Sequence, residues 1–322
     1  MRDVLTIATR GTELALAQTQ NVISLLKEKY PGMRIKIKKV AAEGDKDTRT
    51  VLWELKATGF FTSLLEDALA AGEADFAVHS FKDMPTRERE GLTIAAICER
   101  HFVEDCLISS GGTAILAVFS RAGSPCHTPI EQLKSSARIG TSSLRRMVQI
   151  KNLRPDLEPV PVRGSVPTRI RCLEKGKFDA IILARAGVER LGLGGKISFC
   201  FDPQRFIPAP AQGALAVQVK TDDVETCKLI SAIDDEKIRI VTSAERKILQ
   251  TMRCGCHTPV GAFAKIVGDD IIIWAFVSDL TAENFIRRQI AGPIKDAEKL
   301  AEKLANELLQ AGGRKILENL KE

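Results

Sequence analysis

Strand-like and helix-like segments alternate along the first part of the chain, and this alternation restricts it to an α/β fold. The expected strands are residues 4–8, 34–40 and 75–80, and the expected helices are residues 12–29 and 61–69. Strands that alternate with helices usually form parallel sheets. Ligands of such sheets bind at the carboxyl ends of the strands, so the loops after these strands are the first places to look for function.

The alternation restarts near residue 103 and predicts a second α/β domain. Its expected strands are residues 137–140, 159–162 and 178–184, and its expected helices are residues 142–153, 167–175 and a segment through 187–190. From about residue 236 the pattern becomes a helix at 238–252, a hairpin at 262–278, a strand at 285–291 and an amphipathic helix at 297–308. A small α+β domain is therefore expected last.

Composition narrows the class of ligand. The net charge is +6, yet only 5% of the residues are aromatic, and basic residues are spread among acidic ones rather than gathered in a tract. A small polyanionic substrate fits this pattern better than nucleic acid does. No apolar stretch reaches roughly 18 residues, so no membrane span is expected. The eight cysteines are expected as thiols in a reducing cytoplasm, because so long and apolar a chain needs no disulfides to fold.

The segment at 79–85 places two charged residues, Lys82 and Asp83, just after a predicted strand. A carboxylate in that position can stabilise a cation or move a proton during a reaction. A solvated turn before Pro85 explains the same residues without any function.

The segment at 140–146 leads into a predicted helix with Arg145 and Arg146 in its first turn. Free backbone N–H groups and guanidinium groups together make a carboxylate or phosphate site. An ordinary N-cap explains the small hydroxyl residues but not the arginines, because the helix dipole disfavours cations at this end. A bound anion would remove that conflict.

The segment at 163–169 repeats the theme, with Arg163, a capping Ser165 and Arg169 around another helix start. Two such starts in one domain favour a ligand that carries several carboxylates. Arg10 and Arg190 follow other predicted strands and would join them, although each alone is an ordinary surface arginine.

The loop at 252–261 contains Cys254 and Cys256, one residue apart, followed by His257. A zinc site is one interpretation, but paired zinc ligands are usually separated by two to four residues. A thiol without a role is another interpretation. The third is a thiolate used for covalent attachment.

In this order, these segments resemble the hydroxymethylbilane synthase (porphobilinogen deaminase) family. The similarity covers nearly the whole chain, and its strength lies in the collinear set rather than in any one motif. The matching segments are residues 7–10, 14–16, 44–45, 59–61, 82–83, 140–146, 163–164, 179–184, 211–214, 244–246 and 255–256.

The resemblance implies an α/β fold of three domains, in which two domains resemble periplasmic binding proteins and enclose a cleft, and a C-terminal α+β domain carries the cofactor cysteine. The implied boundaries are residues 1–98 with 214–232 for the first domain, 103–200 for the second and 236–322 for the third. The return of the chain to the first domain follows from the resemblance alone.

The resemblance also implies an activity: the stepwise deamination and head-to-tail condensation of four porphobilinogen molecules into the linear tetrapyrrole hydroxymethylbilane, in heme biosynthesis. The implied cofactor is a dipyrromethane, thioether-linked to Cys256, and no metal is implied. Asp83 and Lys82 are the implied catalytic residues, with Asp83 stabilising positive charge and shuttling protons. A cytoplasmic monomer is expected, with neither a nucleic-acid partner nor a membrane partner.

The implied binding residues are mostly cations, which suits a chain of pyrroles that each carry two carboxylates. For the cofactor they are Cys256, Arg145, Arg146, Ser143, Thr141 and Lys82, and for the substrate Arg10, Arg163, Arg169, Arg190, Ser165, Phe61 and Gln212.

Four features depart from the family pattern. Thr58 replaces a usual lysine, Ser165 a usual asparagine and Cys254 a usual glycine, and residues 110–129 look like an insertion. Two other classes stay open on the sequence: a non-catalytic bilobed protein that binds an acidic small molecule, which needs only the cleft arginines, and a nucleic-acid-binding regulator, which the scarce aromatics disfavour.

Overall fold

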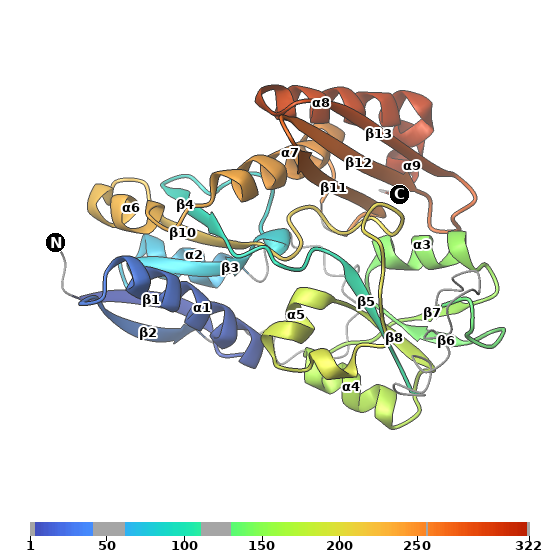
Figure 1. The fold of residues 1–322 in the computed structure, drawn as a ribbon, viewed down its shortest axis with the longest axis horizontal. Coiled ribbons are helices and arrows are strands. Elements are labelled where there is room, and N and C mark those ends of the chain that lie inside the picture. The colour runs from blue at the N-terminus through green and yellow to red at the C-terminus, as the bar shows by residue number, and fades with distance from the viewer. Residues whose placement is uncertain (1–3, 41–61, 111–129, 256, 321–322) are drawn as a thin grey trace.

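The computed structural model describes residues 4–40, 62–110, 130–255 and 257–320. Figure 1 shows two lobes, each built on a twisted sheet, and a third unit that packs above them. Two segments cross between the lobes at the centre of the molecule, residues 99–104 on the way out and residues 201–214 on the way back. No helix in these ranges is long and apolar enough to cross a membrane.

The first lobe is a five-stranded sheet in the order β2-β1-β3-β10-β4. Its elements are β1 (Val4–Arg10), α1 (Glu13–Lys29), β2 (Arg34–Val40), α2 (Ser63–Ala70), β3 (Phe76–Ser80), η3 (Phe81–Asp83), β4 (Leu92–Cys98), β10 (Leu215–Lys220) and α6 (Val224–Ser231). The apolar faces of α1 and α6 bury their side chains against the sheet, and α2 packs with the ends of β1 and β3.

The second lobe is also a five-stranded sheet, in the order β7-β6-β8-β5-β9. Its elements are β5 (Asp105–Ser109), β6 (Arg138–Gly140), α3 (Leu144–Leu153), β7 (Glu158–Val160), α4 (Val166–Glu174), β8 (Ala180–Ala184), α5 (Arg185–Arg190), η5 (Gly194–Lys196) and β9 (Phe199–Cys200).

The two sheets have matching strand orders and matching directions. In each, four of the five strands run in the same direction, and the remaining strand, β10 or β5, is antiparallel to both of its neighbours. The expectation of parallel sheets therefore holds for the direction of four strands in each sheet and is wrong for β10 and β5. The antiparallel direction of β5 and β10 follows from the crossing of the chain, because both strands enter their sheets directly from the other lobe rather than through a helix of their own lobe.

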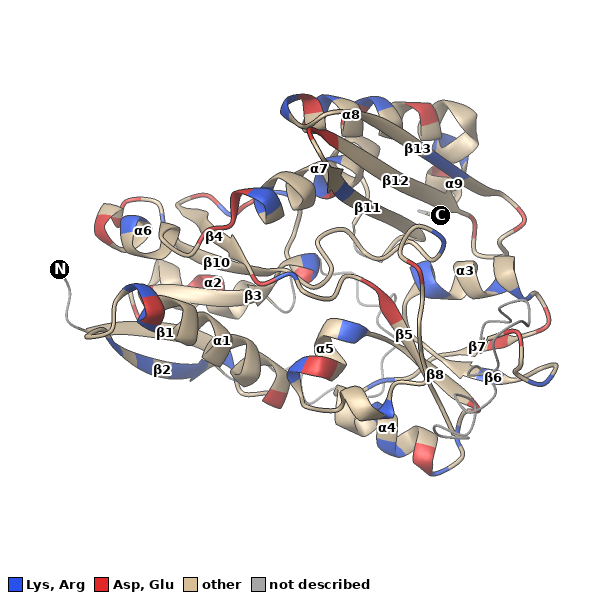
Figure 2. Ribbon diagram, viewed as in Figure 1, with Lys and Arg blue, Asp and Glu red and all other residues tan. Residues whose placement is uncertain are grey.

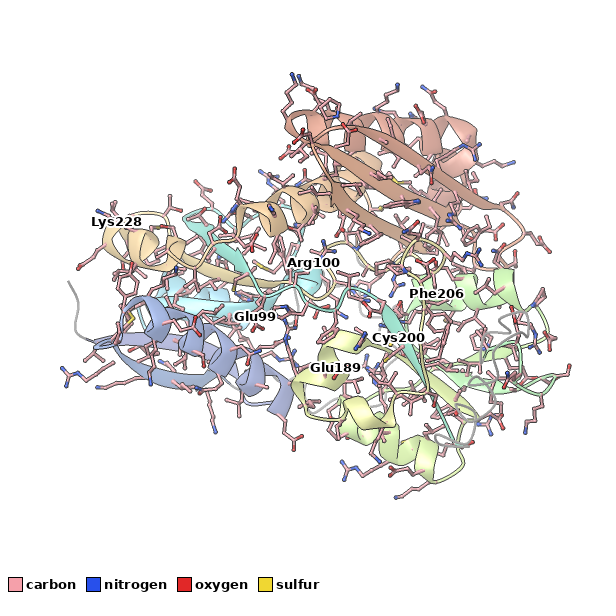
Figure 3. All side chains as sticks on the ribbon, in the orientation of Figure 1. Glu99, Arg100, Glu189, Cys200, Phe206 and Lys228 are labelled. Carbon is pink, nitrogen blue, oxygen red and sulfur yellow. The ribbon has the colours of Figure 1, made fainter. Side chains whose placement is uncertain are left out.

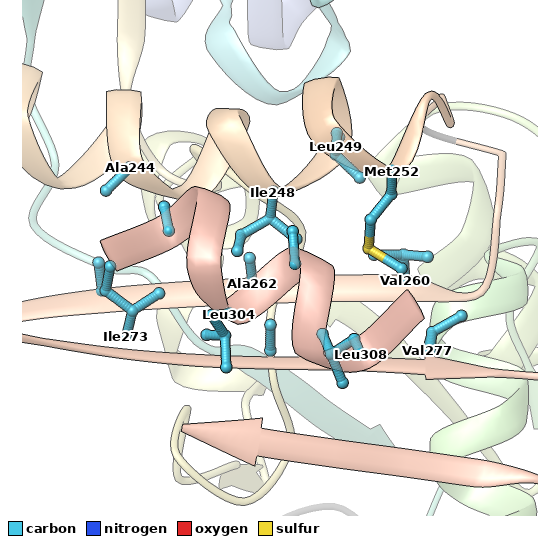
Figure 4. Packing of buried hydrophobic residues seen from close by; sticks show 14 of the residues in the cluster. Ala244, Ile248, Leu249, Met252, Val260, Ala262, Ile273, Val277, Leu304 and Leu308 are labelled. Atoms are coloured by element: carbon cyan, nitrogen blue, oxygen red, sulfur yellow. The ribbon is translucent and has the colours of Figure 1, made fainter. Parts of the chain in front are cut away.

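The third unit is an antiparallel sheet in the order β11-β12-β13 with helices on one face. Its elements are α7 (Glu236–Met252), β11 (Val260–Val267), β12 (Asp270–Ser278), β13 (Phe285–Pro293), η6 (Ile294–Asp296), α8 (Ala297–Leu308), η7 (Leu309–Gly313) and α9 (Arg314–Asn319). Figure 4 shows the core, where Ile248 of α7 and Leu304 of α8 meet Ile273 of the sheet. Gly268, at φ 62°, lies in the expected turn of the hairpin.

Local chemistry explains where the helices begin. The side chains of Thr12, Ser165 and Asp235 accept hydrogen bonds from the backbone three residues on, at the starts of α1, α4 and α7. These starts lie within two residues of those that apolar spacing predicts. The strands β4 and β5 were not among the expected strands. They lie directly before and after the first crossing between the lobes.

Candidate active site

Lys82 and Asp83 lie on η3, at the carboxyl end of β3. The side chain of Asp83 is exposed and that of Lys82 is partly buried. Arg246 of α7 holds this turn from behind, because its guanidinium donates to the carbonyls of Phe81 (3.3 Å) and Pro85 (2.6 Å) and stacks 4.4 Å from the centre of the Phe81 ring. The third unit therefore fixes the backbone that presents Asp83.

Asp105, the first residue of β5, is fully buried and forms ion pairs with two arginines. The Asp105 carboxylate lies 2.8 Å from Nη1 of Arg145 and 2.8 Å from Nη2 of Arg146. The arginines also donate to the carbonyls of Ile207 and Ile182. Burial alone would raise the pKa of Asp105, but the two guanidinium groups outweigh burial and hold that pKa well below its usual range.

The first turn of α3 has its counter-ion within the protein. The sequence predicts a bound anion beside the two arginines of this turn, whereas in the structure the carboxylate of Asp105 pairs with both of them. One carboxylate faces two guanidinium groups, so the cluster keeps a net positive charge, as an anion site requires. Figure 2 shows the acidic start of β5 between the basic positions of η3 and α3. Asp105 was not among the expected site residues, because nothing in the sequence distinguishes it from a surface aspartate.

Gln212 joins the two lobes at this cluster. Its amide nitrogen donates to Oδ1 of Asp105 at 2.9 Å, and its amide oxygen accepts from Nζ of Lys82 at 3.4 Å. Burial lowers the pKa of Lys82 to about 8, while Asp83 opposes the shift and Arg146 adds to it. A lysine of the first lobe and two arginines of the second thus belong to one electrostatic unit.

Arg169 extends this unit along α4. Its Nε donates to the carbonyl of Gly164 at 2.8 Å. Burial lowers the pKa of Arg169 to about 10, Arg146 and Arg163 add to the shift, and Asp83 opposes it. Arg169 therefore lies close enough to Asp83, across the two lobes, for their charges to interact.

The two helix starts use their hydroxyl groups differently. Ser165 is an ordinary N-cap, whose side chain accepts from the backbone N–H of Thr168 at 3.4 Å. Ser143 occupies the N-cap position of α3 but makes no side-chain capping bond. Its backbone N–H instead donates to the hydroxyl of the buried Thr141 at 3.3 Å. The capping explanation of the serines holds for α4 and not for α3.

Arg190 fastens the two crossing segments to α5. Its guanidinium donates to the carbonyl of Glu99 at 3.0 Å and to that of Gly213 at 2.7 Å. Burial lowers the pKa of Arg190, and Glu99 opposes the shift. Arg10 ends β1, the strand beside β3, so it lies at the same edge of the first sheet as η3.

Arg100 and Glu245 tie the first crossing to the third unit, and the sequence analysis also missed this pair. Nη2 of Arg100 lies 2.8 Å from both carboxylate oxygens of Glu245. Glu245 also accepts from the backbone N–H groups of Ala211 and Ala264, at 2.7 and 2.8 Å. Burial raises the pKa of Glu245 and Arg100 opposes the shift. Figure 3 labels Glu99 and Arg100 at this central position. The only hint of this pair in the sequence is that residues 244–246 are one of the segments that match the family.

Phe61, Cys256 and the polar segment with Thr58 lie outside the described residues, as do residues 111–129 of the supposed insertion. Beside Cys256, the backbone N–H and the hydroxyl of Thr258 donate to the carbonyl of Gly255, at 3.2 and 2.6 Å. Cys254 packs against the core of the third unit. Among the described residues, no group of histidine, cysteine and acidic side chains is arranged to hold a metal.

The arrangement can bind carboxylates and transfer protons. Buried guanidinium groups with a fixed counter-ion bind anions without having to reorganise, and an exposed carboxylate beside them can accept or return a proton. Both kinds of group meet where the lobes face each other.

Two family models match the chain. Residues 5–228 match "Porphobilinogen deaminase, dipyromethane cofactor binding domain", and residues 240–310 match "Porphobilinogen deaminase, C-terminal domain". A porphobilinogen deaminase of Syntrophobacter fumaroxidans is 37% identical over 317 residues, which cover 98% of each chain. One of Desulforudis audaxviator is 38% identical over 317 residues, again with 98% of each chain covered.

Among solved structures, the methionine-binding protein MetQ is similar with a TM-score of 0.43 and 12% identity, covering 74% of this chain and 92% of that one.

Proposed function

This chain belongs to the porphobilinogen deaminase family, and we propose that its two lobes divide the reaction between anchored cations that hold carboxylates and one exposed carboxylate that serves the chemistry. The activity itself is that of the family: the polymerisation of porphobilinogen in tetrapyrrole biosynthesis, on a dipyrromethane cofactor. The alternative of a non-catalytic binding protein is set aside by this membership.

The observation that carries the proposal is the chain of contacts from Lys82 through Gln212 to Asp105 and its two arginines. It links the lobes with several positive charges, and a dipyrromethane carries several carboxylates, so the donors suit the group. Lys82, Arg145, Arg146, Thr141 and Ser143 would hold it. When bound, it supplies the free pyrrole carbon from which the product chain grows.

Asp83 is the proposed catalytic carboxylate. Its exposure lets it exchange protons with solvent and substrate, and Arg246 fixes the turn that carries it. Next to the pyrrole nitrogens of porphobilinogen, it would stabilise the positive charge that develops as ammonia leaves. Lys82 would bind a substrate or product carboxylate beside it.

Arg163 and Arg169 are the proposed binders of incoming substrate carboxylates, because their two positive charges repel each other and an anion between them would relieve that repulsion. Ser165 would act through the start of α4. Gln212 would act by orienting Lys82, and Arg190 by holding the crossings. Arg10 and Phe61 keep their proposed substrate-binding roles on the strength of the family match.

The domain boundaries are also proposed from the family: residues 1–98 with 214–232, then 103–200 and then 236–322. The membership of β10 in the first sheet supports the return of the chain. A cytoplasmic monomer is proposed as well.

Cys256 is the proposed attachment point, with Cys254 a bystander. Packing of Cys254 against the core of the third unit supports this choice, since a thiol held there is less accessible to a bulky reactant. Intact-mass analysis of Cys254→Ser and Cys256→Ser tests it, with each variant purified and then given porphobilinogen.

We expect Cys254→Ser to keep a two-pyrrole adduct and to show heavier species as rings add. Cys256→Ser should show the bare polypeptide and no turnover. The reverse pattern would move the attachment to Cys254, and an unmodified wild-type chain would contradict the proposed cofactor attachment altogether.

A further inference from the structure

Two cysteines lie directly opposite each other on neighbouring strands of the second lobe. β5 and β9 are antiparallel, and their register pairs Cys106 with Cys200. The N–H of Phe201 donates to the carbonyl of Asp105 at 2.9 Å, one residue outside the cysteines on each strand, so Cys106 and Cys200 form a non-hydrogen-bonded pair. The Cα atoms of such pairs are about 4.5 Å apart, which lies within the range of about 4.4–6.8 Å that disulfides span.

The two side chains share one face of the sheet. Cys106 is fully buried in an apolar cluster with Ile181 and Val188, and Cys200 packs against the same cluster while remaining partly exposed. Both are reduced thiols. Figure 3 labels Cys200 in the second lobe, near Glu189 of α5. The register and the shared face therefore place the two thiols where a cross-strand disulfide can form.

The surroundings decide which thiol meets a reactant first. Burial raises the pKa of both thiols, but for Cys200 the neighbouring Arg185 opposes the shift most strongly. Arg185 is held there by ion pairs with Glu104 (2.7 Å) and Glu189 (2.9 Å). Glu104 and Glu189 add to the rise in the pKa of Cys200. Cys200 is the more accessible of the two thiols, so it meets a reactant first.

We propose that Cys106 and Cys200 are a redox-active dithiol, which a low-molecular-weight disulfide converts reversibly into a cross-strand disulfide. The Cys200 thiolate attacks one sulfur of the small disulfide, whose S–S bond breaks and releases one small thiolate. Cys106 then loses its proton and attacks Sγ of Cys200, which expels the second small thiol. In sum, two protein thiols are oxidised and one small disulfide is reduced to two thiols.

A disulfide between Cys106 and Cys200 would tie β9 to β5 at the point where the chain crosses between the lobes. β5 begins where the first crossing ends, and β9, only two residues long, ends where the return crossing begins. β9 lies at the edge of its sheet and pairs with β5 alone. A covalent link would fasten this short edge strand beside Asp105, the anchor of Arg145 and Arg146. Oxidation should therefore stabilise this strand in the folded lobe.

The test uses the holoenzyme and oxidised glutathione at pH 8, followed by alkylation of the remaining thiols and non-reducing peptide mapping. We expect one linked peptide pair that contains Cys106 and Cys200, formed within hours and reversed by dithiothreitol. Cys172→Ser is the matched control, because Cys172 contacts the same apolar cluster. It should oxidise like wild type, whereas Cys106→Ser should accumulate a mixed disulfide between Cys200 and glutathione.

Two results would overturn the proposal: a mixed disulfide that persists at Cys200 in the wild-type protein, or a link from Cys106 to any other cysteine. Urea unfolding gives a second readout. Oxidation should raise the unfolding midpoint of wild type and of Cys172→Ser and leave Cys200→Ser unchanged. An equal shift in Cys200→Ser would assign the effect to other thiols. Neither readout depends on where the cofactor is attached.

Discussion

The two lobes share one strand order but differ in how firmly they hold the charged groups that they bring to the site. In the second lobe, Arg145 and Arg146 are only 4% and 7% exposed and share the buried counter-ion Asp105. In the first lobe, Asp83 is exposed at the end of a strand, with its backbone fixed but its carboxylate open to solvent. A group that holds a ligand benefits from being anchored, whereas a group that exchanges protons must stay accessible.

The largest expected effect comes from breaking the anchored side. Asp105→Asn leaves two buried guanidinium groups without their counter-ion, and breaking a buried pair in this way typically costs about 3–5 kcal/mol of folding stability. Urea unfolding of the purified variant measures the change. Asp156→Asn is the control, because that carboxylate pairs with Arg154 at the surface of the same lobe and should matter little. Equal losses in both variants would show that Asp105 anchors nothing.

Breaking the exposed side should affect rate rather than stability. Asp83→Ala removes the carboxylate beside the reacting pyrroles, and loss of one such electrostatic group costs about a hundredfold or more in kcat. The unfolding midpoint should stay near wild type, because the side chain is exposed. Asp67→Ala, an exposed carboxylate of the same lobe that pairs with Arg89, is the control for turnover. Near-normal tetrapyrrole production by Asp83→Ala at saturating porphobilinogen would contradict its catalytic role.

The comparison also separates what the sequence could predict from what it could not. The helices α1, α3, α4, α7 and α8 follow from apolar spacing, with capping residues at the starts of α1, α4 and α7. The positions of Lys82 and Asp83 follow from their place after a strand. These signals are local. Strand direction is not local, because β5 and β10 owe their antiparallel direction to the crossing of the chain between lobes.

Asp105 shows the same limit within the site. Its partners are 40 residues or more away along the chain, at Arg145, Arg146 and Gln212, so no spacing rule can pair them. Because the helix dipole disfavours cations in a first turn, a negative charge was expected at the start of α3, but it was expected from a ligand rather than from Asp105. Arg246 and Glu245 were recognisable only as part of a family pattern, since their bonds reach η3 and the first crossing.

Two arginines sharpen the comparison, with smaller effects. Arg163→Leu should lower kcat/KM about ten- to hundredfold, since a charge-assisted hydrogen bond is worth roughly 1.5–3 kcal/mol. It should leave the unfolding midpoint nearly unchanged. Arg145→Leu should lower both kcat/KM and the midpoint, because it leaves Asp105 with Arg146 as its remaining guanidinium partner. Steady-state kinetics and urea unfolding check both variants. Wild-type substrate dependence in both would exclude their binding roles.

The smallest expected effect concerns Lys82, which lies between the two kinds of group. Its pKa, lowered to about 8 chiefly by burial, means that its charge is present below pH 8 and is lost as the pH rises above that value. Bound carboxylates favour the charged form, so substrate binding must be accompanied by proton uptake in this range, and affinity must fall as the pH rises.

We therefore expect kcat/KM of the wild-type holoenzyme to decline along a basic limb at or above pH 8. Lys82→Arg keeps its charge throughout and should lack that limb, even if its absolute rate is lower. The matched comparison is Lys38→Arg, a surface lysine of the same lobe that pairs with Glu73 and should retain the wild-type profile. An unchanged basic limb in Lys82→Arg would assign the titration to another group. Lys82 would then be an anchored cation like Arg145 and Arg146, and not a group that gains and loses a proton during binding.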